Sequence, residues 1–491
     1  MRWAKPLSEL IGQLPLTCPP GAEAIVVSDI VEDARDVTPG CLFVARSGSR
    51  FDGRTFIDQA RQAGAVAVLV DSRGCEHATI PVIRSNSPSD HAVLMADRLF
   101  ESPLAALPVF AVTGTNGKTT TATFLHHLFG SQTGLIGSIE IDDSKDVTPS
   151  RLTTPPPLEL RRIMARMLHH GCKRVVMEAS SHGISLGRMN DLDIRCAIFT
   201  NLSGDHLDFH GSMKAYAAAK RALFAGLKPP AFSVVNLDDP VAAIMAAASP
   251  VRVIGCRMHS DGPAHVKVTH DHTGAVQIEW PDRIIQTRLR MPGAHNAMNL
   301  AQAMAALVAS GVDSECSSLE TLPVPRGRLE PVDITGCGAR IYVDFAHTDQ
   351  ALAHALESLR PLVPSNGKLR VVFGCGGDRD PLKRPRMGAV ADRLADVAYV
   401  TSDNPRTETP RAIIDDILAG ISDEHGVVVE PDRARAIQTA VEDCDEHDLL
   451  LIAGKGHECA QLIGDQVIPF DDRRVAREAI KAAGGTVSAD V

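Results

Sequence analysis

The stretch "PVFAVTGTNGKTTTATFLHHLF" (residues 108–129) joins an apolar run to a helix-like segment through a turn that carries two glycines and one lysine. The apolar run at 109–113 predicts a buried strand, and the segment from 118 onward predicts a helix. Backbone N–H groups and a helix N-terminus then converge near Lys118, which is the arrangement that binds anions. The stretch therefore predicts an α/β fold with a phosphate site at the end of a strand.

The turn is a shortened form of the P-loop, because Val112 stands where the usual pattern has its first glycine. Lys118 would neutralise the β- and γ-phosphates of ATP, and Thr119 would offer its hydroxyl to Mg²⁺. A turn that merely needs glycine would not require a strand, a lysine, a hydroxyl and a helix together. We predict ATP binding by Gly114, Thr115, Asn116, Gly117, Lys118, Thr119 and Thr120.

Two further stretches place metal-binding residue types after apolar runs. Glu178 lies in "VVMEASSHG", and His206 lies in "FTNLSGDHLDFHG" together with Asp205 and Asp208. Mg²⁺ prefers oxygen ligands, and the carboxyl ends of parallel strands meet at one sheet edge. A lone histidine or a capping aspartate would also fit this pattern, but the neighbouring phosphate loop favours a site.

The 491 residues exceed one ordinary core, so about three domains are expected. Residues 25–99 alternate apolar runs with helical stretches. A second series of strands starts at 109, and a third includes "RIYVDFAH", "LRVVFGCGGD", "VAYVTSDNPR" and "DLLLIAGKGHE". Each strand leads into polar residues, which is typical of a mostly parallel sheet. We predict three α/β domains at 1–100, 101–325 and 326–491.

Composition excludes several classes of protein. A net charge of −10 argues against nucleic acid as a partner, and no apolar stretch is long enough for membrane insertion. The start lacks the apolar region of a signal peptide, and the 11 cysteines form no C-x-x-C pair. These features predict a cytoplasmic protein with reduced thiols.

The motifs "VTGTNGKTTT", "MEASSHG", "FTNLSGDHLDFHGSMKAYAAAK", "MPGAHNAMN", "RGRLE", "DFAHT", "FGCGGDRD", "DNPR" and "AGKGHE" occur in the order found in one enzyme family. The chain resembles the ATP-dependent Mur ligases of peptidoglycan synthesis, most of all those that add diaminopimelate. The resemblance implies a small N-terminal UDP-binding domain, a central P-loop ATPase domain and a C-terminal Rossmann-like domain that brings the amino acid.

The resemblance also implies roles for individual residues. Lys118, Glu178, His206 and Lys220 match catalytic residues, and Thr119, Glu178, His206 and Lys220 match ligands of one or two Mg²⁺ ions. Lys220 in "YAAAKRALF" matches a lysine that is carbamylated in the family; from spacing alone it would be a solvated helix residue. Further nucleotide contacts are implied for Asn296, Arg328 and Asp344. Contacts to the UDP-muramoyl dipeptide are implied for Thr153, Thr154, Ser180 and Arg188.

A zwitterionic amino acid needs paired positive and negative partners, and arginine binds a carboxylate through two N–H groups. Residues that match the family's diaminopimelate contacts are Arg379, Asp403, Asn404, Pro405, Arg406, Gly454 and Glu458. The resemblance implies that Arg406 pairs with the distal carboxylate, which lysine lacks. By itself, "DNPR" would be read as a proline turn after a strand.

Four positions depart from the family pattern. Ala34, Leu152 and Leu186 replace polar residues on the nucleotide-sugar side, and Asp349 replaces a proline at an expected helix start. Each lost hydrogen bond to a ligand costs about 0.5–1.5 kcal/mol, which is tolerable singly. Together the three apolar replacements leave the acyl acceptor open.

The implied activity is an ATP-dependent, ADP-forming amide ligase that joins meso-diaminopimelate to the D-glutamate γ-carboxylate of UDP-N-acetylmuramoyl-L-alanyl-D-glutamate, acting as a monomer. A paralogous ligase with another acyl acceptor is the first alternative. A P-loop NTPase switch without ligase activity is the second. A protein similar to folylpolyglutamate synthetase shares the later domains, but the N-terminal "DARDVTPG" and "DNPR" count against it.

Overall fold

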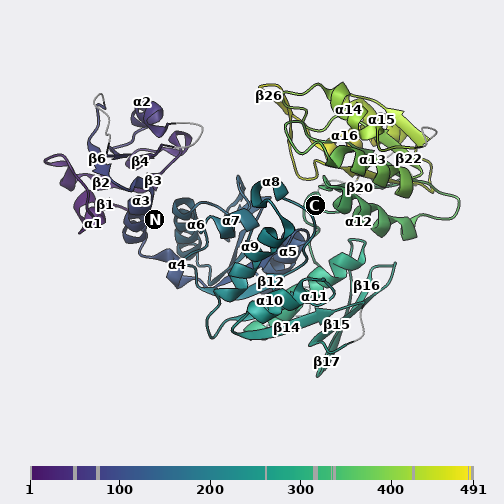
Figure 1. The fold of residues 1–491 in the computed structure, drawn as a ribbon, viewed down its shortest axis with the longest axis horizontal. Helices are drawn as coiled ribbons and strands as arrows, with labels where there is room; N and C mark the ends of the chain where they lie inside the picture. Colours follow the sequence, from purple (N-terminus) through teal and green to yellow (C-terminus); the bar gives the residue numbers. More distant parts are fainter. Residues whose placement is uncertain are drawn as a thin grey trace. The chain divides into compact units, whose positions relative to one another are not determined.

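The computed structural model describes residues 3–47, 52–72, 78–259, 262–312, 319–332, 334–335, 339–422, 426–484 and 486–487. Contacts divide the chain into two compact units, Met1–Ala111 with Gly130–Arg195, and Val112–Phe129 with Cys196–Val491. Figure 1 draws both units as ribbons and labels many of their helices and strands.

The first unit begins with a parallel sheet in the order β3-β4-β5-β6, formed by Asp29–Val31, Cys41–Ala45, Ala67–Asp71 and Val82–Ser85. All of β4 is buried because alternate side chains enter two cores. Leu42 and Val44 join the core of α1 and α3, whereas Phe43 joins the core of α2. The sheet is thus covered on both faces.

Short elements surround this sheet. Strand β1 (Lys5–Pro6) pairs antiparallel with β2 (Val26–Val27). The helices and 3₁₀ turns are α1 (Leu7–Ile11), η1 (Ala22–Ala24), η2 (Ala34–Asp36), η3 (Gly53–Phe56), α2 (Ile57–Gln62), α3 (Pro88–Leu99) and α4 (Pro103–Ala106).

The rest of the first unit has the strand order β10-β9-β8-β11-β7. Its elements are β7 (Val109–Thr113), β8 (Thr133–Ile136), β9 (Glu140–Asp142), β10 (Val147–Pro149), α6 (Pro157–His169), β11 (Arg174–Glu178) and α7 (Ser181–Ser185). Strands β8 and β11 are parallel, so the carboxyl end of β11 delivers Glu178 to the sheet edge.

Strand β7 continues into the second unit, where the order is β7-β12-β13-β14-β15-β16-β17. The strands are β12 (Ile194–Phe199), β13 (Phe232–Asn236), β14 (Arg252–Arg257), β15 (Val266–His270), β16 (Ala275–Trp280) and β17 (Arg283–Arg288), of which the last two pair antiparallel. The helices are α5 (Lys118–Phe129), α8 (Leu207–His210), α9 (Met213–Ala225), α10 (Ala242–Ala248) and α11 (Ala294–Ser310). Helices α5 and α11 pack together, as Figure 1 shows.

The C-terminal sheet of the second unit has the order β18-β20-β24-β21-β22-β23, antiparallel at β18–β20 and parallel elsewhere. Its strands are Glu330–Val332, Arg340–Asp344, Leu449–Ala453, Leu369–Phe373, Val397–Val400 and Val427–Val429 in that order. Alternation along β24 sends Leu451 into the core of α12, α13 and α14, and Leu450 into the core of α15 and α16.

The remaining elements of this part complete the fold. They are α12 (Asp349–Leu359), η5 (Arg360–Leu362), α13 (Lys383–Leu394), α14 (Pro410–Leu418), α15 (Arg433–Glu442), α16 (Asp472–Ala482), the hairpin β25 (Ala460–Ile463) and β26 (Gln466–Pro469), and the pair β19 (Ile334–Thr335) and β27 (Thr486–Val487). Asp349 is the first residue of α12, as expected.

The predicted α/β fold with a mostly parallel central sheet is confirmed, and the second series of strands begins at 109–113 as predicted. The domain boundaries near 100 and 325 stay predictions. Among the described residues, no helix is both long and apolar enough to cross a bilayer.

Candidate active site

The phosphate loop lies between β7 and α5, as predicted, and Asn201 after β12 supports it. The backbone N–H of Thr115 donates to the Asn201 carbonyl, and that of Asn116 donates to Asn201 Oδ1, each at 2.9 Å. The Thr200 hydroxyl donates to the Asn116 carbonyl at 2.6 Å. Sequence reasoning missed Asn201 and Thr200, although both lie at a strand end beside the loop.

Glycine is required at both ends of this loop. A Cβ at Gly114 would overlap the Thr200 hydroxyl. Gly117 has φ = 82°, and a Cβ there would lie 2.6 Å from Asn299 Oδ1. The two glycines therefore allow neighbouring polar side chains to approach the backbone closely.

Two lysines converge on one oxygen of the loop. Lys118 Nζ donates to the carbonyls of Gly114 (3.1 Å) and Thr115 (2.8 Å). Lys220, from α9, donates to the same Gly114 carbonyl at 2.8 Å. The predicted residues Thr119 and Thr120 are buried in the first turn of α5.

Lys220 is almost fully buried, with 1% of its surface exposed. Its Nζ lies 4.4 Å from the ring centroid of Tyr216, which is one turn earlier on α9. Burial, and then the charge of Lys118, lower the pKa of Lys220 well below its usual value. The lowered pKa increases the share of the neutral, nucleophilic amine.

His206 lies just before α8 with φ = 53° and 45% of its side chain exposed. Its Nε2 is 3.5 Å from Asp205 Oδ2, and its ring meets the Tyr216 ring edge-on at 6.2 Å. The Tyr216 hydroxyl is 3.2 Å from Thr115 Oγ1, so Tyr216 connects His206 to the phosphate loop. The side chain of Asp208 lies outside the described residues.

Glu178, in the first unit, is buried at the end of β11. Its carboxylate accepts hydrogen bonds from the Ser138 N–H (2.7 Å) and the Ser138 hydroxyl (2.9 Å). The Ser138 hydroxyl is also 3.0 Å from Thr153 Oγ1. Ser138 was not predicted, because its serine-containing turn carries no recognisable pattern.

Of the other residues predicted to bind the acceptor, Ser180 and Arg188 both contact Thr154. Thr154 Oγ1 donates to the Glu178 carbonyl (2.9 Å) and accepts from the Ser180 N–H (3.0 Å). The Ser180 hydroxyl donates to the same Oγ1 at 3.0 Å, and Arg188 donates to the Thr154 carbonyl at 2.7 Å. The structure therefore brings Thr153, Thr154, Ser180 and Arg188 together with Glu178.

The three apolar replacements differ in their surroundings. Ala34 is buried in η2, whereas Leu152 and Leu186 are 44% and 55% exposed. Leu152 and Leu186 therefore present apolar surface at positions where the family pattern has polar side chains.

The predicted nucleotide residues Asn296 and Arg328 both reach the loop region. Asn296, on α11, accepts from Asn299 Nδ2 at 3.3 Å, and Asn299 is the side chain that faces Gly117. Arg328 donates to the Thr119 hydroxyl at 3.3 Å, and its guanidinium carbon lies 4.9 Å from the centroid of the Phe345 ring.

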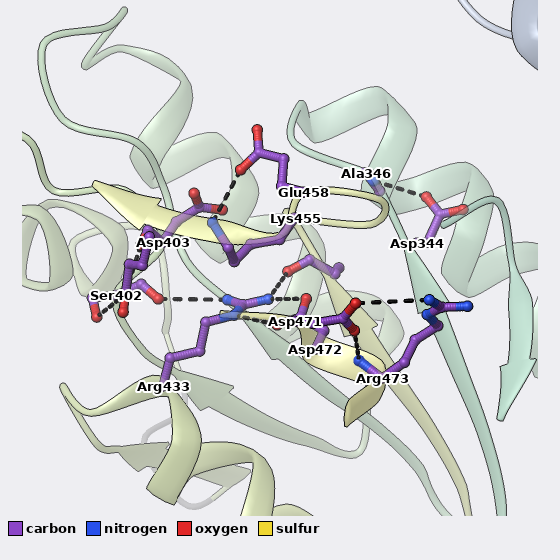
Figure 2. Close-up of polar contacts among 12 residues, drawn as sticks. Asp344, Ala346, Ser402, Asp403, Arg433, Lys455, Glu458, Asp471, Asp472 and Arg473 are labelled. Atoms are coloured by element: carbon purple, nitrogen blue, oxygen red, sulfur yellow. Dashed lines mark hydrogen bonds and ion pairs between the residues drawn. The ribbon is translucent and has the colours of Figure 1, made fainter. Parts of the chain in front are cut away.

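Asp344, at the end of β20, anchors the chain on either side. Its carboxylate accepts from the N–H of Leu329 (2.7 Å) and of Ala346 (2.8 Å), the second of which is drawn in Figure 2. Burial raises the pKa of Asp344, although the charge of Arg328 opposes the shift.

The residues predicted to bind the amino acid gather at the carboxyl ends of β21, β22 and β24. Asn404 Nδ2 donates to Glu458 Oε2 at 2.8 Å. Asp403 is buried, and a Cβ at Gly454 (φ = 115°) would lie 2.6 Å from its Oδ2. Burial raises the pKa of Asp403. The charge of Glu458 also acts to raise the pKa of Asp403, and both side chains are drawn in Figure 2.

Arg406 has φ = 51°, and the surrounding backbone holds it there. Its N–H donates to the Leu462 carbonyl (3.0 Å), and its carbonyl accepts from the Gly464 N–H (2.7 Å). The guanidinium donates to the Gly377 carbonyl at 2.7 Å. A left-handed residue fixed in this way is typical of functional sites.

Arg379 and Pro405 lie in the same loops. Arg379 is exposed. Hydrogen bonds from Thr407 lower the pKa of the nearby Asp378, and the charges of Arg406 and Arg379 lower it further. A Cβ at Gly377 would clash with the Pro405 carbonyl. Glycine at 377 therefore allows the loop after β21 to contact the loop after β22.

A buried charge network below this cluster was missed by sequence reasoning. Arg433, with 1% of its surface exposed, donates to both carboxylate oxygens of Asp472 at 2.7 Å, and to the carbonyls of Ala453 (3.0 Å) and Ser402 (3.5 Å). The Ser402 carbonyl lies just after β22, and the Ala453 carbonyl is at the end of β24. Arg433 therefore links the carboxyl ends of these two strands, as Figure 2 shows.

The fold and site are those of a P-loop enzyme with a second polar site at the carboxyl edge of another parallel sheet. Family models match residues 27–107 (Mur ligase family, catalytic domain), 112–307 (Mur ligase middle domain) and 327–456 (Mur ligase, glutamate ligase domain). The chain belongs to the Mur ligase family.

Individual relatives narrow the comparison. The chain is 41% identical over 468 residues to the UDP-N-acetylmuramoyl-L-alanyl-D-glutamate–2,6-diaminopimelate ligase of Geobacillus kaustophilus, covering 92% of this chain and 94% of the relative. A solved structure of a ligase of the same name is 30% identical with a TM-score of 0.62, covering 99% of this chain and all of the other. A MurF ligase from Thermotoga maritima in complex with ADP shares the fold, with 19% identity, a TM-score of 0.65, and 92% and 96% of the two chains covered.

Proposed function

We propose that this chain is an ADP-forming ligase that joins meso-diaminopimelate to the D-glutamate γ-carboxylate of UDP-N-acetylmuramoyl-L-alanyl-D-glutamate in peptidoglycan synthesis. The observation that carries the proposal is the cluster of Asn404, Arg406 and Glu458, in a chain 41% identical to a ligase with that name. Residues 1–100 would bind the UDP part, 101–325 ATP, and 326–491 the amino acid. The ligase would act as a monomer in the cytoplasm, where ATP is supplied and its free cysteines stay reduced.

The reaction forms an acyl phosphate and then an amide. The γ-carboxylate oxygen takes the γ-phosphoryl group of ATP, which leaves ADP. A neutral amine of diaminopimelate attacks the acyl carbon, the C–O bond to phosphate breaks, and the amine loses a proton. Lys118 and the loop N–H groups would stabilise charge on the transferring phosphoryl group.

The donor set fits Mg²⁺. Glu178 offers a buried carboxylate held by Ser138, and Thr119 offers a hydroxyl at the start of α5. Among the described residues, no group of three or more histidine, cysteine or acidic side chains forms a ready metal site. Mg²⁺ would supply positive charge against the phosphates; His206 and Lys220 would complete the ligands.

We also propose that Lys220 is carbamylated. Its lowered pKa makes the neutral amine available, and only the neutral amine adds CO₂. The product is an anionic oxygen ligand in place of a cation, beside the positive charge of Lys118. This would remove the repulsion between two ammonium groups that share the Gly114 carbonyl.

A different acyl acceptor is the second candidate, favoured by the exposure of Leu152 and Leu186. The two acceptors are separated by measuring ADP formation with Mg·ATP and meso-diaminopimelate, with and without the UDP-dipeptide, and with L-lysine as the control amine. Turnover that needs both the UDP-dipeptide and diaminopimelate supports the proposed ligase. ADP formation without any acceptor or amine would instead indicate an NTPase switch. Binding of ATP and diaminopimelate without turnover would mean another acceptor.

A further inference from the structure

Lys455 lies against the amino-acid cluster and has no exposed surface. It follows β24 by two residues, and its Nζ donates to Asn404 Oδ1 and to Glu458 Oε2, both at 3.0 Å. Figure 2 shows Lys455 pointing between the two acidic side chains of the cluster, Asp403 and Glu458. Because the side chain is fully enclosed, a bound amino acid cannot touch it.

The ammonium group determines which way the Asn404 amide faces. An ammonium only donates hydrogen bonds, so it must face the amide oxygen. The Leu462 N–H donates to the same Oδ1 at 3.0 Å. These two donors turn Asn404 Nδ2 toward Glu458 Oε2, to which it donates at 2.8 Å.

The Glu458 carboxylate is held through one oxygen only. Oε2 accepts from both Lys455 and Asn404, whereas in the described part of the chain no hydrogen bond reaches Oε1. The side chain is 36% exposed, so Oε1 is the oxygen left for a ligand. A carboxylate anchored in this way presents a fixed acceptor to an ammonium group.

Lys455 also keeps this carboxylate ionised. Burial acts to raise the pKa of Glu458, but the charge of Lys455 and the hydrogen bonds from Asn404 and Lys455 outweigh it, so the pKa lies below its usual value. His457, Asp403 and Arg433 also interact electrostatically with Glu458.

We propose that Lys455 is a positioning residue for the amino-acid substrate: it fixes the Asn404 amide and the Glu458 carboxylate so that Glu458 Oε1 faces the ammonium group of a zwitterionic amino acid. The role rests on the proposed ligase function and acts entirely through Asn404 and Glu458.

The test compares Lys455→Met, which keeps the length but loses the charge, with Arg370→Met. Arg370 is buried at the opposite end of the same sheet, where its Nε donates to Asp448 Oδ2 at 2.6 Å, just before β24. Each variant removes the cation of an ion pair, with Glu458 in one case and with Asp448 in the other, so both are expected to lower the thermal unfolding midpoint. Arg370 thus controls for loss of stability alone.

Lys455→Met is expected to raise the KM for diaminopimelate about ten- to hundredfold, the loss typical of a charged hydrogen bond, with little change in the KM of ATP or the acceptor. Arg370→Met should leave all three KM values near those of the wild type. An unchanged diaminopimelate KM in Lys455→Met, or an equal rise for all three substrates, would overturn the positioning role. If Lys455→Met does not fold, Lys455→Gln, which keeps one donor, is expected to show a smaller but equally selective rise.

The diaminopimelate KM measured as a function of pH adds a readout that a loss of stability alone would not change. Without Lys455 the pKa of Glu458 rises, so the diaminopimelate KM should begin to increase at a higher pH as the solution is acidified. Arg370→Met should keep the wild-type profile, and a wild-type profile in Lys455→Met contradicts the proposal. A wild type without turnover on diaminopimelate would refute the proposed function instead, which keeps the two failures distinct.

Discussion

Lys220 Nζ donates to the Gly114 carbonyl at 2.8 Å, and Lys118 donates to the same oxygen at 3.1 Å. One loop carbonyl thus accepts from two ammonium groups, one of them buried. Such a pair favours the neutral form of the buried amine, which makes the chemical state of Lys220 the first property to test.

Lys220→Ala is expected to abolish turnover, because the proposed carbamate ligand is lost. Added short carboxylates such as formate or acetate should restore part of the activity by entering the vacated space. ADP formation measures both effects. Lys214→Ala removes an exposed lysine of the same helix and should retain full activity. Full activity in Lys220→Ala would rule out the carbamate role.

Arg406→Ala should raise the KM for diaminopimelate by about ten- to hundredfold, since a charged hydrogen-bonded contact is lost. Discrimination against L-lysine should weaken in parallel, because lysine lacks the distal carboxylate. The measurement is kcat/KM for both amines. Arg411→Ala, an exposed arginine on α14 paired with Asp415, is the matched control. Unchanged discrimination would remove Arg406 from the specificity argument.

Gly454→Ala places a Cβ 2.6 Å from Asp403 Oδ2 at a backbone with φ = 115°. The Asp403 carboxylate must move, so amino-acid binding should fall steeply in calorimetry while ATP binding persists. Gly484→Ala shares the strain of a positive φ (85°) but meets no atom within 4 Å. Similar amino-acid binding in the two variants would show that the Asp403 contact does not matter.

His457 links stability to pH. Burial, and then the charge of Arg328, lower the pKa of His457 to about 4, and its buried Nδ1 has no hydrogen-bond partner among the described residues. The unfolded chain therefore binds a proton below about pH 6.5 that the folded chain does not bind until about pH 4. Stability should fall as pH decreases across this window, by at most about 1.4 kcal/mol per pH unit from this group.

Thermal unfolding from pH 7 to 4.5 checks this expectation. His457→Gln cannot take up the proton, so its midpoint should fall less steeply with acid than that of the wild type. His447→Gln removes a histidine that is 43% exposed and should follow the wild-type slope. Parallel slopes for His457→Gln and the wild type would contradict the assignment.

Features that follow from local pattern could be predicted from the sequence. The phosphate loop is contiguous, and the strands that lead into Glu178, Asn404 and Gly454 are short apolar runs with polar ends. The antiparallel strands β15 to β17 were overlooked although "VKVTH" and "AVQIEW" alternate around the turn at 271–274.

Other parts of the site depend on tertiary contacts between distant residues. Ser138 meets Glu178 across 40 positions, and Lys455 meets Asn404 across 51. A single polar residue near a strand end looks alike whether it is solvated or supports a site, so neither contact leaves a local pattern. The contact partners appear only when the strands are assembled.

The Arg433–Asp472 pair restricts how this chain can diverge. Replacing either residue alone leaves an unpaired charge in the interior, which typically lowers the free energy of unfolding by about 3–5 kcal/mol. Replacing both by well-packed apolar residues is often neutral. Homologues should therefore keep both residues or change both, and an intermediate ancestor with one of them would need compensation elsewhere. Positions 433 and 472 are expected to evolve as one unit, and a double-mutant cycle would measure the epistasis that joins them.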